Sequence, residues 1–186
     1  MLKKRIFLLL TVCLALQWSF ACALEHDFAG AFSVRYPDTW ELDENFAPDS
    51  STEDFKVLGA FETYTSLIEI SISDDRAYYE DFSVPTQMNS EYYGYLAELM
   101  GMLERADDTL SCEYVKGVWN DQGNALFLVF YVEDGAGGYY YADTMLGGCT
   151  LLFYAYSDQT LLDTGARQLA ELETLLKSIT FNDELF

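Results

Sequence analysis

The feature that most constrains the fold of this sequence is the run from Ala125 to Val132, in which every side chain is aliphatic or aromatic. A strand with one solvated face alternates between apolar and polar side chains. A run without alternation therefore predicts a strand that is covered on both faces. A buried helix is the alternative for such a run, but the β-branched and aromatic residues and the flanking turn residues favour a strand.

Short turns that contain glycine or asparagine connect this run to three more strand-like segments. The four predicted strands are Leu110–Trp119, Asn124–Glu133, Tyr139–Leu146 and Cys149–Ser157. Glycine adopts positive φ angles without steric cost, so each connection predicts a hairpin turn. The sequence therefore predicts an antiparallel meander at the centre of the fold. Within it, Leu151 to Tyr156 is almost as apolar as the first run, and we expect both of its faces to be covered too.

Strands and helices are also predicted on either side of the meander. Alternating side chains predict strands at Ala31–Tyr36, Asp54–Glu62 and Leu67–Ser73, with a polar lead-in at Leu24–Gly30 before them. In the second of these strands Phe55, Val57, Gly59 and Phe61 are expected on one side, and in the third Ile68, Ile70 and Ile72 are expected to face the core while Glu69, Ser71 and Ser73 face out.

Two segments have the apolar periodicity of amphipathic helices, at Ser90–Arg105 and Gln159–Ser178. The buried stripe of the first is expected to be Tyr92, Leu96, Leu99 and Leu103, and that of the second Leu162, Ala166, Leu169, Leu172 and Leu176. Ile179 to Phe181 then closes the chain against the sheet. The predicted fold class is α+β, a central antiparallel sheet of about six or seven strands with helices on both faces, an α/β/α sandwich.

Residues 1–23 have the pattern of a signal peptide, so we expect the mature chain to be one domain over residues 24–186. Lys3, Lys4 and Arg5 precede an apolar stretch, and Ala21-Cys22-Ala23 is a small-residue cleavage motif. The protein is therefore expected to be secreted or extracytoplasmic. Lipid attachment at Cys22 is the less favoured alternative, because the leucine usual three positions before such a cysteine is missing. No later run is long and apolar enough to predict a membrane span.

The chain is strongly acidic, with a formal net charge of −21. The first 23 residues contain three of the ten basic residues and no acidic one, which leaves a mature chain with a charge of −24. Such a surface repels the phosphates of nucleic acids and anionic lipids, so we expect neither as a partner. High charge commonly serves solubility alone; the more specific interpretation is a protein partner with a basic surface, or bound cations.

Cys112 and Cys149 are the two cysteines that follow the predicted signal peptide. An even number in an oxidising compartment suggests a disulfide. In the predicted meander, however, the two cysteines begin strands at opposite ends of the sheet, whereas a disulfide needs Cα atoms within about 7 Å. We therefore expect two buried free thiols.

Both ends of the mature chain resemble a known family. Residues 32–40, Phe-Ser-Val-Arg-Tyr-Pro-Asp-Thr-Trp, resemble the opening of PsbP-like proteins, and residues 175–181, Leu-Leu-Lys-Ser-Ile-Thr-Phe, resemble their closing segment. The resemblance implies an antiparallel sheet between helices, as inferred above, and a role in binding other proteins. The family has no defining set of catalytic residues, so the resemblance implies no site residue.

Catalytic and metal-binding motifs are not evident in the sequence. The single histidine, His26, lies near the predicted mature N-terminus, which is a poor place for a residue that must be held in a cleft. The many carboxylates leave open a hydrolase or lyase that uses two facing acids. The acidic loop from Asp43 to Asp54 leaves open calcium or small-ligand binding, although it lacks the spacing of an EF-hand. We therefore expect no cofactor, no catalytic residues and no metal site.

Tyrosines are the candidates for an interaction surface. Tyr93 lies off the apolar stripe of the first helix, and Tyr139, Tyr140 and Tyr141 are consecutive, so they alternate between the faces of a strand. Exposed tyrosines suit contact surfaces because each combines a rigid ring with a polar tip; filling of the layers between sheet and helices is the alternative. The sequence thus predicts an exported, non-catalytic binding or accessory protein that acts through protein–protein contacts.

Overall fold

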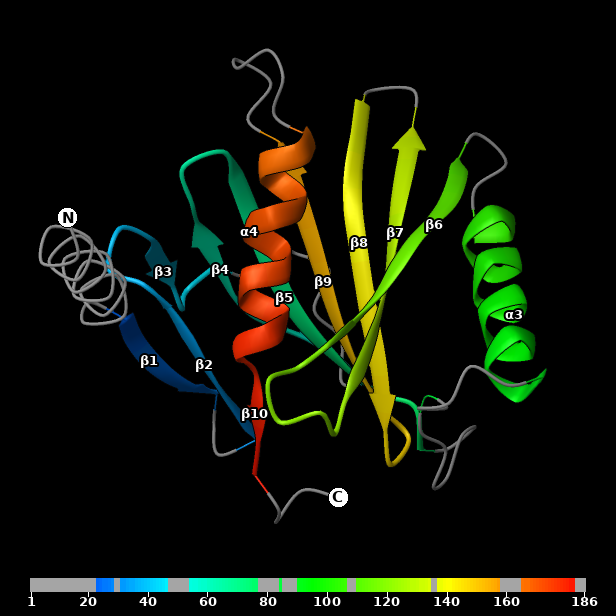
Figure 1. Cartoon of the computed structure of the whole chain (residues 1–186), viewed down its shortest axis with the longest axis horizontal. Coiled ribbons are helices and arrows are strands. Elements are labelled where there is room, and N and C mark those ends of the chain that lie inside the picture. Colours follow the sequence, from blue (N-terminus) through cyan, green and yellow to red (C-terminus); the bar gives the residue numbers. More distant parts are fainter. Residues whose placement is uncertain are drawn as a thin grey trace, which may run out of the picture.

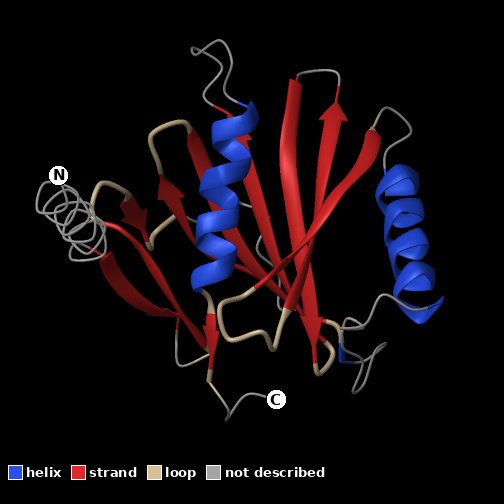
Figure 2. Ribbon diagram, in the orientation of Figure 1, coloured by secondary structure: helices blue, strands red, loops and turns tan. Residues whose placement is uncertain are grey.

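The computed structural model describes residues 23–28, 31–46, 54–76, 84, 90–106, 110–134, 137–157 and 165–182. Two antiparallel sheets and two long helices account for most of these residues (Figures 1 and 2). The elements are β1 (Ala23–Phe28), β2 (Phe32–Pro37), β3 (Glu41–Asp43), β4 (Phe55–Glu62), β5 (Ser66–Asp74), α3 (Ser90–Ala106), β6 (Ser111–Trp119), β7 (Leu126–Asp134), β8 (Gly137–Leu146), β9 (Cys149–Ser157), α4 (Gly165–Ser178) and β10 (Thr180–Phe181).

The larger sheet has seven strands in the order β3-β4-β5-β9-β8-β7-β6, and all its pairs are antiparallel. Four consecutive strands, β6 to β9, form the predicted meander. Helix α4 crosses one face in front of β5 and β9, and α3 lies on the other side of the molecule, next to β6 (Figure 1). The predicted α+β fold, with a central antiparallel sheet between helices, is confirmed. None of the helices among the described residues is long and apolar enough to cross a membrane.

Strand β7 is covered on both faces, as its sequence predicts. Ala125, Phe127 and Val129 belong to a core cluster on the α4 side of the sheet. Leu126 and Leu128, with Phe130 and Val132 further along, belong to a second cluster on the α3 side. All seven side chains are at most 2% exposed. The strand therefore separates two cores and contributes to each.

A second sheet of three strands, in the order β1-β2-β10, is not predicted by the sequence. The expected lead-in at Leu24–Gly30 instead contributes β1, which pairs with β2 along its whole length, from Ala23 opposite Pro37 to Phe28 opposite Phe32. This sheet packs on the α4 face of the larger sheet through aromatic rings: the centroids of Tyr36 and Phe61 are 4.7 Å apart. Trp40, which is 7% exposed, joins the same cluster.

Strand β4 contains a β-bulge that changes which side its residues face. The register with β5 shifts between Val57 and Gly59. Phe55 therefore lies opposite Ser73, on the α3 side, whereas Phe61 lies opposite Ile68, on the α4 side. The expectation that Phe55, Val57, Gly59 and Phe61 share one side was wrong, because the extra residue of a bulge shifts the alternation by one.

Strand β5 alternates as predicted, but its polar side is buried as well. Ile68 and Ile70 are completely buried in the α4-side core, and Ile72 packs against it. On the other side Ser71 is 0% and Glu69 9% exposed, and the Ser71 hydroxyl donates to Glu69 Oε1 at 2.9 Å. The expectation that both face solvent was wrong, because the strand lies in the interior of a two-sided sheet.

Helix α4 packs on the sheet through a stripe that overlaps the predicted one only in part and also includes Leu175 and Ser178. Leu172 and Leu176 are buried as expected, but Ala166 is exposed and Gln168 is 2% exposed in its place. The Gln168 amide donates to the backbone carbonyl of Ala155 in β9, so its polar group is satisfied in the core. The start expected at Gln159, including Leu162, lies outside the described residues.

The carboxylate of Glu171 attaches α4 to the turn between β4 and β5. Its Oε2 accepts hydrogen bonds from the hydroxyls of Thr63 at 2.7 Å, Thr65 at 2.6 Å and Ser66 at 2.9 Å. Three donors replace the water that this oxygen gives up on packing. The position of the helix over β5 therefore depends on polar as well as apolar contacts.

Cys112 and Cys149 do not form a disulfide with each other, and both are half-buried rather than fully buried as expected. Cys112 lies opposite Val132, at the end of the sheet where Tyr139 pairs with Tyr156. Cys149 lies opposite Leu146, at the other end. The geometric reason given for expecting free thiols is therefore confirmed. The predicted signal peptide and the alternative lipid site at Cys22 precede the described residues and stay predictions.

Substituting Asn120 should destabilise the fold strongly, because its side chain satisfies buried backbone groups of other residues. Asn120 is 3% exposed; its Nδ2 donates to the Ile179 carbonyl at 3.1 Å, and its Oδ1 accepts from the backbone N–H groups of Asn124 and Ala125 at 3.1 Å each. We expect Asn120→Ala to lower the free energy of unfolding by about 2–3 kcal/mol, because buried backbone groups lose their partners. Urea denaturation measures this, with the exposed Asn45→Ala as the matched control. Equal losses for the two variants would contradict it.

Candidate functional site: a cavity under helix α3

A cavity of about 290 Å³ lies between α3 and the α3-side face of the larger sheet. It exists because α3 covers this face incompletely: on β9, Leu152 and Tyr154 are only half-buried and Tyr156 is 39% exposed. The expectation that Leu151–Tyr156 is covered on both faces therefore holds only for the α4 side. The cavity is lined by Phe55, Ser73, Asp75, Tyr95, Glu98, Leu99, Met102, Tyr141, Asp143, Met145, Thr150 and Leu152.

Asp143 is the most unusual residue in the cavity wall. It belongs to β8, lies opposite Leu128 of β7 and Leu152 of β9, and is 1% exposed. Its Oδ2 accepts a hydrogen bond from the Tyr141 hydroxyl at 3.1 Å, but its Oδ1 has no partner among the described residues. Burial raises the pKa of this carboxyl from 3.8 to about 7, although the Tyr141 hydrogen bond opposes the shift.

Two further carboxylates reach the cavity from other elements. Asp75 follows β5; its Oδ1 accepts from the Ser73 hydroxyl at 3.0 Å and its Oδ2 from the Thr150 hydroxyl at 2.6 Å. Its backbone N–H donates to the Gly148 carbonyl at 2.9 Å, which holds the residue against the β8–β9 turn. Glu98 comes from the exposed side of α3. The polar part of the cavity therefore consists of three acids and several hydroxyls.

A row of tyrosines continues from the cavity along the same face of the sheet. The ring centroids of Tyr141 and Tyr154 are 5.2 Å apart, and those of Tyr139 and Tyr156 are 5.4 Å apart. Burial raises the pKa of Tyr141 well above 10 and that of Tyr154 to about 12, and the nearby carboxylates add to both shifts. Both phenols are therefore neutral at physiological pH and act as hydrogen-bonding groups rather than charges.

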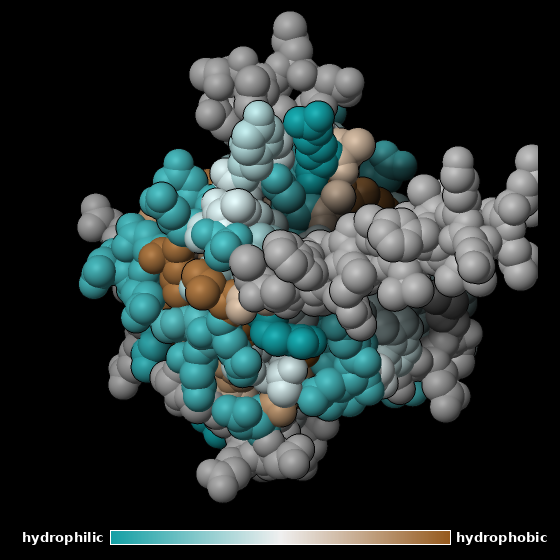
Figure 3. All heavy atoms as spheres, turned by 60° about the vertical axis from the view of Figure 1, so that its left-hand side comes forward, coloured by the Kyte–Doolittle hydropathy of each residue, from teal (hydrophilic) through white to brown (hydrophobic). Residues whose placement is uncertain are grey.

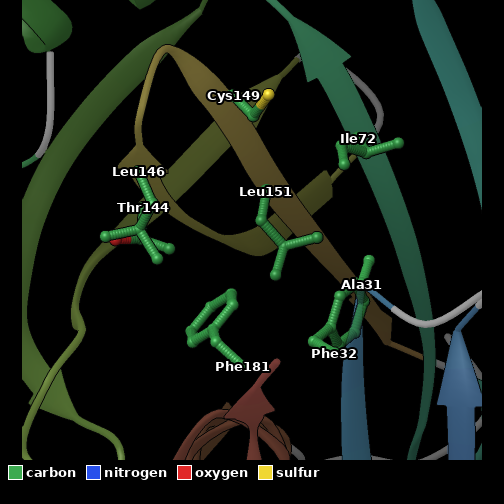
Figure 4. A pocket seen from close by; sticks show the side chains of 8 residues that line it. All are labelled: Ala31, Phe32, Ile72, Thr144, Leu146, Cys149, Leu151 and Phe181. Carbon is green, nitrogen blue, oxygen red and sulfur yellow. The ribbon is translucent and has the colours of Figure 1, made fainter. Parts of the chain in front are cut away.

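A second, much smaller cavity of about 30 Å³ lies between the two sheets (Figure 4). Phe32 and Phe181 from the small sheet face Leu151 and Thr144 from the larger sheet across it. The Thr144 hydroxyl is buried without a partner among the described residues. This space is large enough for one or two waters and otherwise apolar, so it is a packing gap at the junction of the sheets rather than a ligand site.

The structure does not bring the four predicted surface tyrosines together. Tyr93 is 56% exposed on α3, as its position off the stripe predicts. Tyr139 is half-buried on the α3 side, whereas Tyr140 packs against Tyr131, at 5.3 Å between centroids, on the opposite face. Tyr141 is 4% exposed and lines the cavity. The alternation of side chains along β8 separates Tyr139, Tyr140 and Tyr141. Of the four predicted surface tyrosines, only Tyr93 has a largely accessible ring.

The described residues provide no evidence for a binding site at the acidic loop or at His26. Positions 47–53 of the loop lie outside the described residues, so calcium binding there stays a prediction. Among the described residues, no group of three or more His, Cys, Asp or Glu side chains could hold a metal ion. His26 lies in β1 rather than in a lead-in, with its Nδ1 3.6 Å from Glu44 Oε1 and its ring against Phe28.

The sequence around Asp143 indicated that this acid would be buried, although Asp143 was not among the predicted site residues. The predicted strand Tyr139–Leu146 has one charged residue, and the meander places that strand between two apolar neighbours. A charged side chain there faces a protein layer on either side. In a chain with 31 acidic residues this one acid did not stand out by composition, only by position.

Comparison with known proteins identifies the fold and no closer relationship. No family model matches the chain, and no curated protein matches it. The solution structure of cyanobacterial PsbP (CyanoP) from Synechocystis is similar, with 13% identity, a TM-score of 0.51, and coverage of 87% of this chain and 93% of that one.

Two other solved structures match less well. The Ran-binding protein Mog1p of Saccharomyces cerevisiae has 9% identity, a TM-score of 0.46, and coverage of 87% of this chain and 96% of that one. A protein from Bacteroides thetaiotaomicron has 14% identity, a TM-score of 0.43, and coverage of 86% and 48%. At such identities only the fold is shared with CyanoP, and it is PsbP-like, as residues 32–40 and 175–181 suggested.

Asp143 should make the stability of the protein fall as the pH rises. The folded carboxyl, with a pKa of about 7, holds its proton more tightly than the unfolded one at 3.8, so the folded state binds more protons between these values. The contribution of Asp143 to the free energy of unfolding is therefore fully present below about pH 4. It decreases as the pH rises to about 7, by roughly 4 kcal/mol in total. Asp143→Asn should remove this loss, so the variant should be more stable than wild type near pH 8 and similar near pH 4.

Urea denaturation over this pH range measures the effect. Glu113→Gln, at an exposed position of β6, is the matched control for removing one carboxylate from an acidic chain. Parallel pH profiles for wild type and Asp143→Asn would contradict the prediction, because they would show that folding does not raise the pKa of Asp143.

Proposed function

We propose that this chain is an exported, non-catalytic binding protein and that its binding site is the cavity under α3. The observation that carries the proposal is the buried Asp143 carboxyl, with an oxygen unpaired among the described residues, in the wall of a 290 Å³ cavity. An unpaired buried carboxyl is costly unless a bound molecule satisfies it. A cavity of this size approaches the lower end of the range for small-molecule sites.

The polar groups of the cavity suit binding better than catalysis. Acid–base hydrolysis needs a second carboxyl that is free to act on the substrate. Asp143 contacts Tyr141, both oxygens of Asp75 already accept hydroxyl hydrogen bonds, and the third acid, Glu98, is exposed on α3 rather than held facing Asp143 in the interior. Histidine and cysteine, the usual partners in nucleophilic catalysis, are not among the described residues that line the cavity. The carboxylate-based hydrolase or lyase is therefore the weaker proposal.

Export is supported by residues 1–23 and the acidic composition. On the face shown in Figure 3, hydrophilic residues cover most of the described surface, and hydrophobic residues appear only in small areas between them. The large exposed apolar side chains are spread over several elements: Leu24, Tyr64, Tyr93, Met102, Trp119 and Tyr156. This spread favours a site inside the cavity over a broad hydrophobic docking surface.

Blocking the cavity should abolish small-molecule binding. Met102 is 47% exposed at the cavity wall, so Met102→Trp adds a large ring there at a tolerant position of α3. Ala97→Trp, on an exposed part of the same helix that does not line the cavity, is the matched control. The probes are 2-phenylethanol, 2-phenylethylammonium and phenylacetate, followed by ligand-observed NMR. We expect at least one probe to bind wild type and Ala97→Trp but not Met102→Trp. Binding of no probe, or equal binding to all three proteins, would refute the cavity as the site.

Contact with a protein partner that has a basic surface is the second proposal, and the exposure of Tyr93 favours it. Tyr93→Ala should then remove crosslinks between α3 and the partner in the native envelope or medium, without changing binding in the cavity. Tyr64→Ala is the matched control, since Tyr64 is 77% exposed on a different element. Crosslinking followed by mass spectrometry measures this, and recovery of the chain without a partner would count against the proposal.

A further inference from the structure

The acids that line the cavity come from separate parts of the chain and converge on one space. Asp143 belongs to β8, Asp75 follows β5, and Glu98 belongs to α3. Lysine, arginine and histidine are not among the described residues that line the cavity. Arg76, next to Asp75 in sequence, is engaged in an ion pair with Asp74. The cavity therefore has a negative potential that no lining side chain compensates.

The unpaired oxygen of Asp143 defines the kind of group that the cavity can receive. Oδ2 already accepts the Tyr141 hydroxyl at 3.1 Å, which leaves Oδ1 as an acceptor with no donor among the described residues. The Asp143 side chain is 1% exposed, so bulk water does not supply that donor freely. An N–H group that carries positive charge would satisfy the oxygen and the charge together, and such hydrogen bonds are stronger than neutral ones.

The rest of the wall is apolar and limits what else the ligand can be. Phe55, Leu99, Met102, Met145 and Leu152 face the same space as the acids. Together with Tyr95 and Tyr141 they form a surface for a hydrocarbon or aromatic body, and tyrosine rings also attract cations. A bare metal ion does not fit, because the described residues contain no cluster of three close ligands. At about 30 Å³ for each water-sized group, 290 Å³ accommodates roughly ten non-hydrogen atoms.

We propose that the cavity under α3 binds a small organic ammonium ion, with its charged nitrogen at Asp143 and a short apolar body against Leu99, Met102 and Leu152. This inference rests on the proposed function, since it names the ligand class of the same site. Phenylacetate and other anions are excluded by the three acids. The matching neutral alcohol can fill the apolar part but cannot neutralise the charge at Asp143.

Ligand binding should be linked to the ionisation of Asp143. The groups around it are Tyr141 on its own strand, Tyr154 on β9, Tyr95 and Glu98 on α3, and Asp75 after β5. An ammonium ion favours the ionised carboxyl, so binding lowers the pKa of Asp143 from its value of about 7. Affinity should therefore rise between about pH 6 and about pH 8, and binding near pH 6 should release a proton.

The test is isothermal titration calorimetry with 2-phenylethylammonium and 2-phenylethanol, which have the same number of non-hydrogen atoms. Near pH 8 we expect the ammonium ion to bind at least about ten times more tightly than the alcohol. This preference should be smaller near pH 6. Asp143→Asn should remove this preference and the proton release, whereas Asp121→Asn, an exposed carboxylate elsewhere that is 63% exposed, should not. Circular dichroism verifies that each variant is folded.

A second variant keeps the test decisive if Asp143→Asn fails to fold. Glu98→Gln removes a charge from the exposed side of α3, and it should weaken ammonium binding severalfold without affecting the alcohol. Equal affinities for the ammonium ion and the alcohol in wild type, both lost in Met102→Trp, would overturn the ligand class and leave the cavity as the binding site. Binding of neither compound would overturn the ligand class as well, and would count against the proposed function.

Discussion

The structure depends on one constraint, which is that β7 must be covered on both of its faces. In the strand and the residue before it, the side chains from Ala125 to Val132 are all at most 2% exposed except that of Tyr131. Full burial of a large aliphatic or aromatic side chain is worth about 1.5–3 kcal/mol, so the strand is stable only with a layer on either side. Helix α4 and the small sheet form the layer on one side, and α3 forms it on the other. The remaining elements of the fold connect or extend these layers.

Elements whose pattern is local could be predicted from the sequence. The apolar run of β7 and the glycine turns of the meander each concern residues close together in the chain, and the structure has both. The stripe of α3 is equally local: Tyr92 and Leu99 are buried and Leu96 is half-buried as predicted, whereas the burial of Leu103 lies outside the described side chains. The small sheet could not be predicted in this way, because β10 pairs with β2 across almost the whole chain. The β4 bulge was missed for a similar reason. It is defined by the register against β5, and the apolar residues of β4 alone are compatible with uninterrupted alternation.

The cavity was harder to foresee than the fold because it results from incomplete coverage. It requires α3 to cover β6, β7 and part of β8 while leaving space over Leu152, and no sequence pattern reports where a helix stops covering a sheet. The tyrosines illustrate the same difficulty. Their number suggested a surface, yet alternation along β8 places Tyr140 on one face and Tyr141 in the cavity wall. Only the exposure of Tyr93 followed from the helical period alone.

Two other buried or partly buried acids, Glu69 and Glu171, show how Asp143 differs from ordinary core polar groups. Glu171 accepts three hydroxyl hydrogen bonds through one oxygen, and Glu69 accepts the Ser71 hydroxyl. The fold thus has the means to satisfy acids that it uses for structure. Asp143 lies opposite Leu128 and Leu152, where an apolar side chain would pack without a desolvation penalty, and it keeps an oxygen unpaired among the described residues. Local rules of stability are broken most often where function requires it, and this position adjoins the 290 Å³ cavity under α3. The cost of burying Asp143 is therefore best explained by a molecule that the cavity receives.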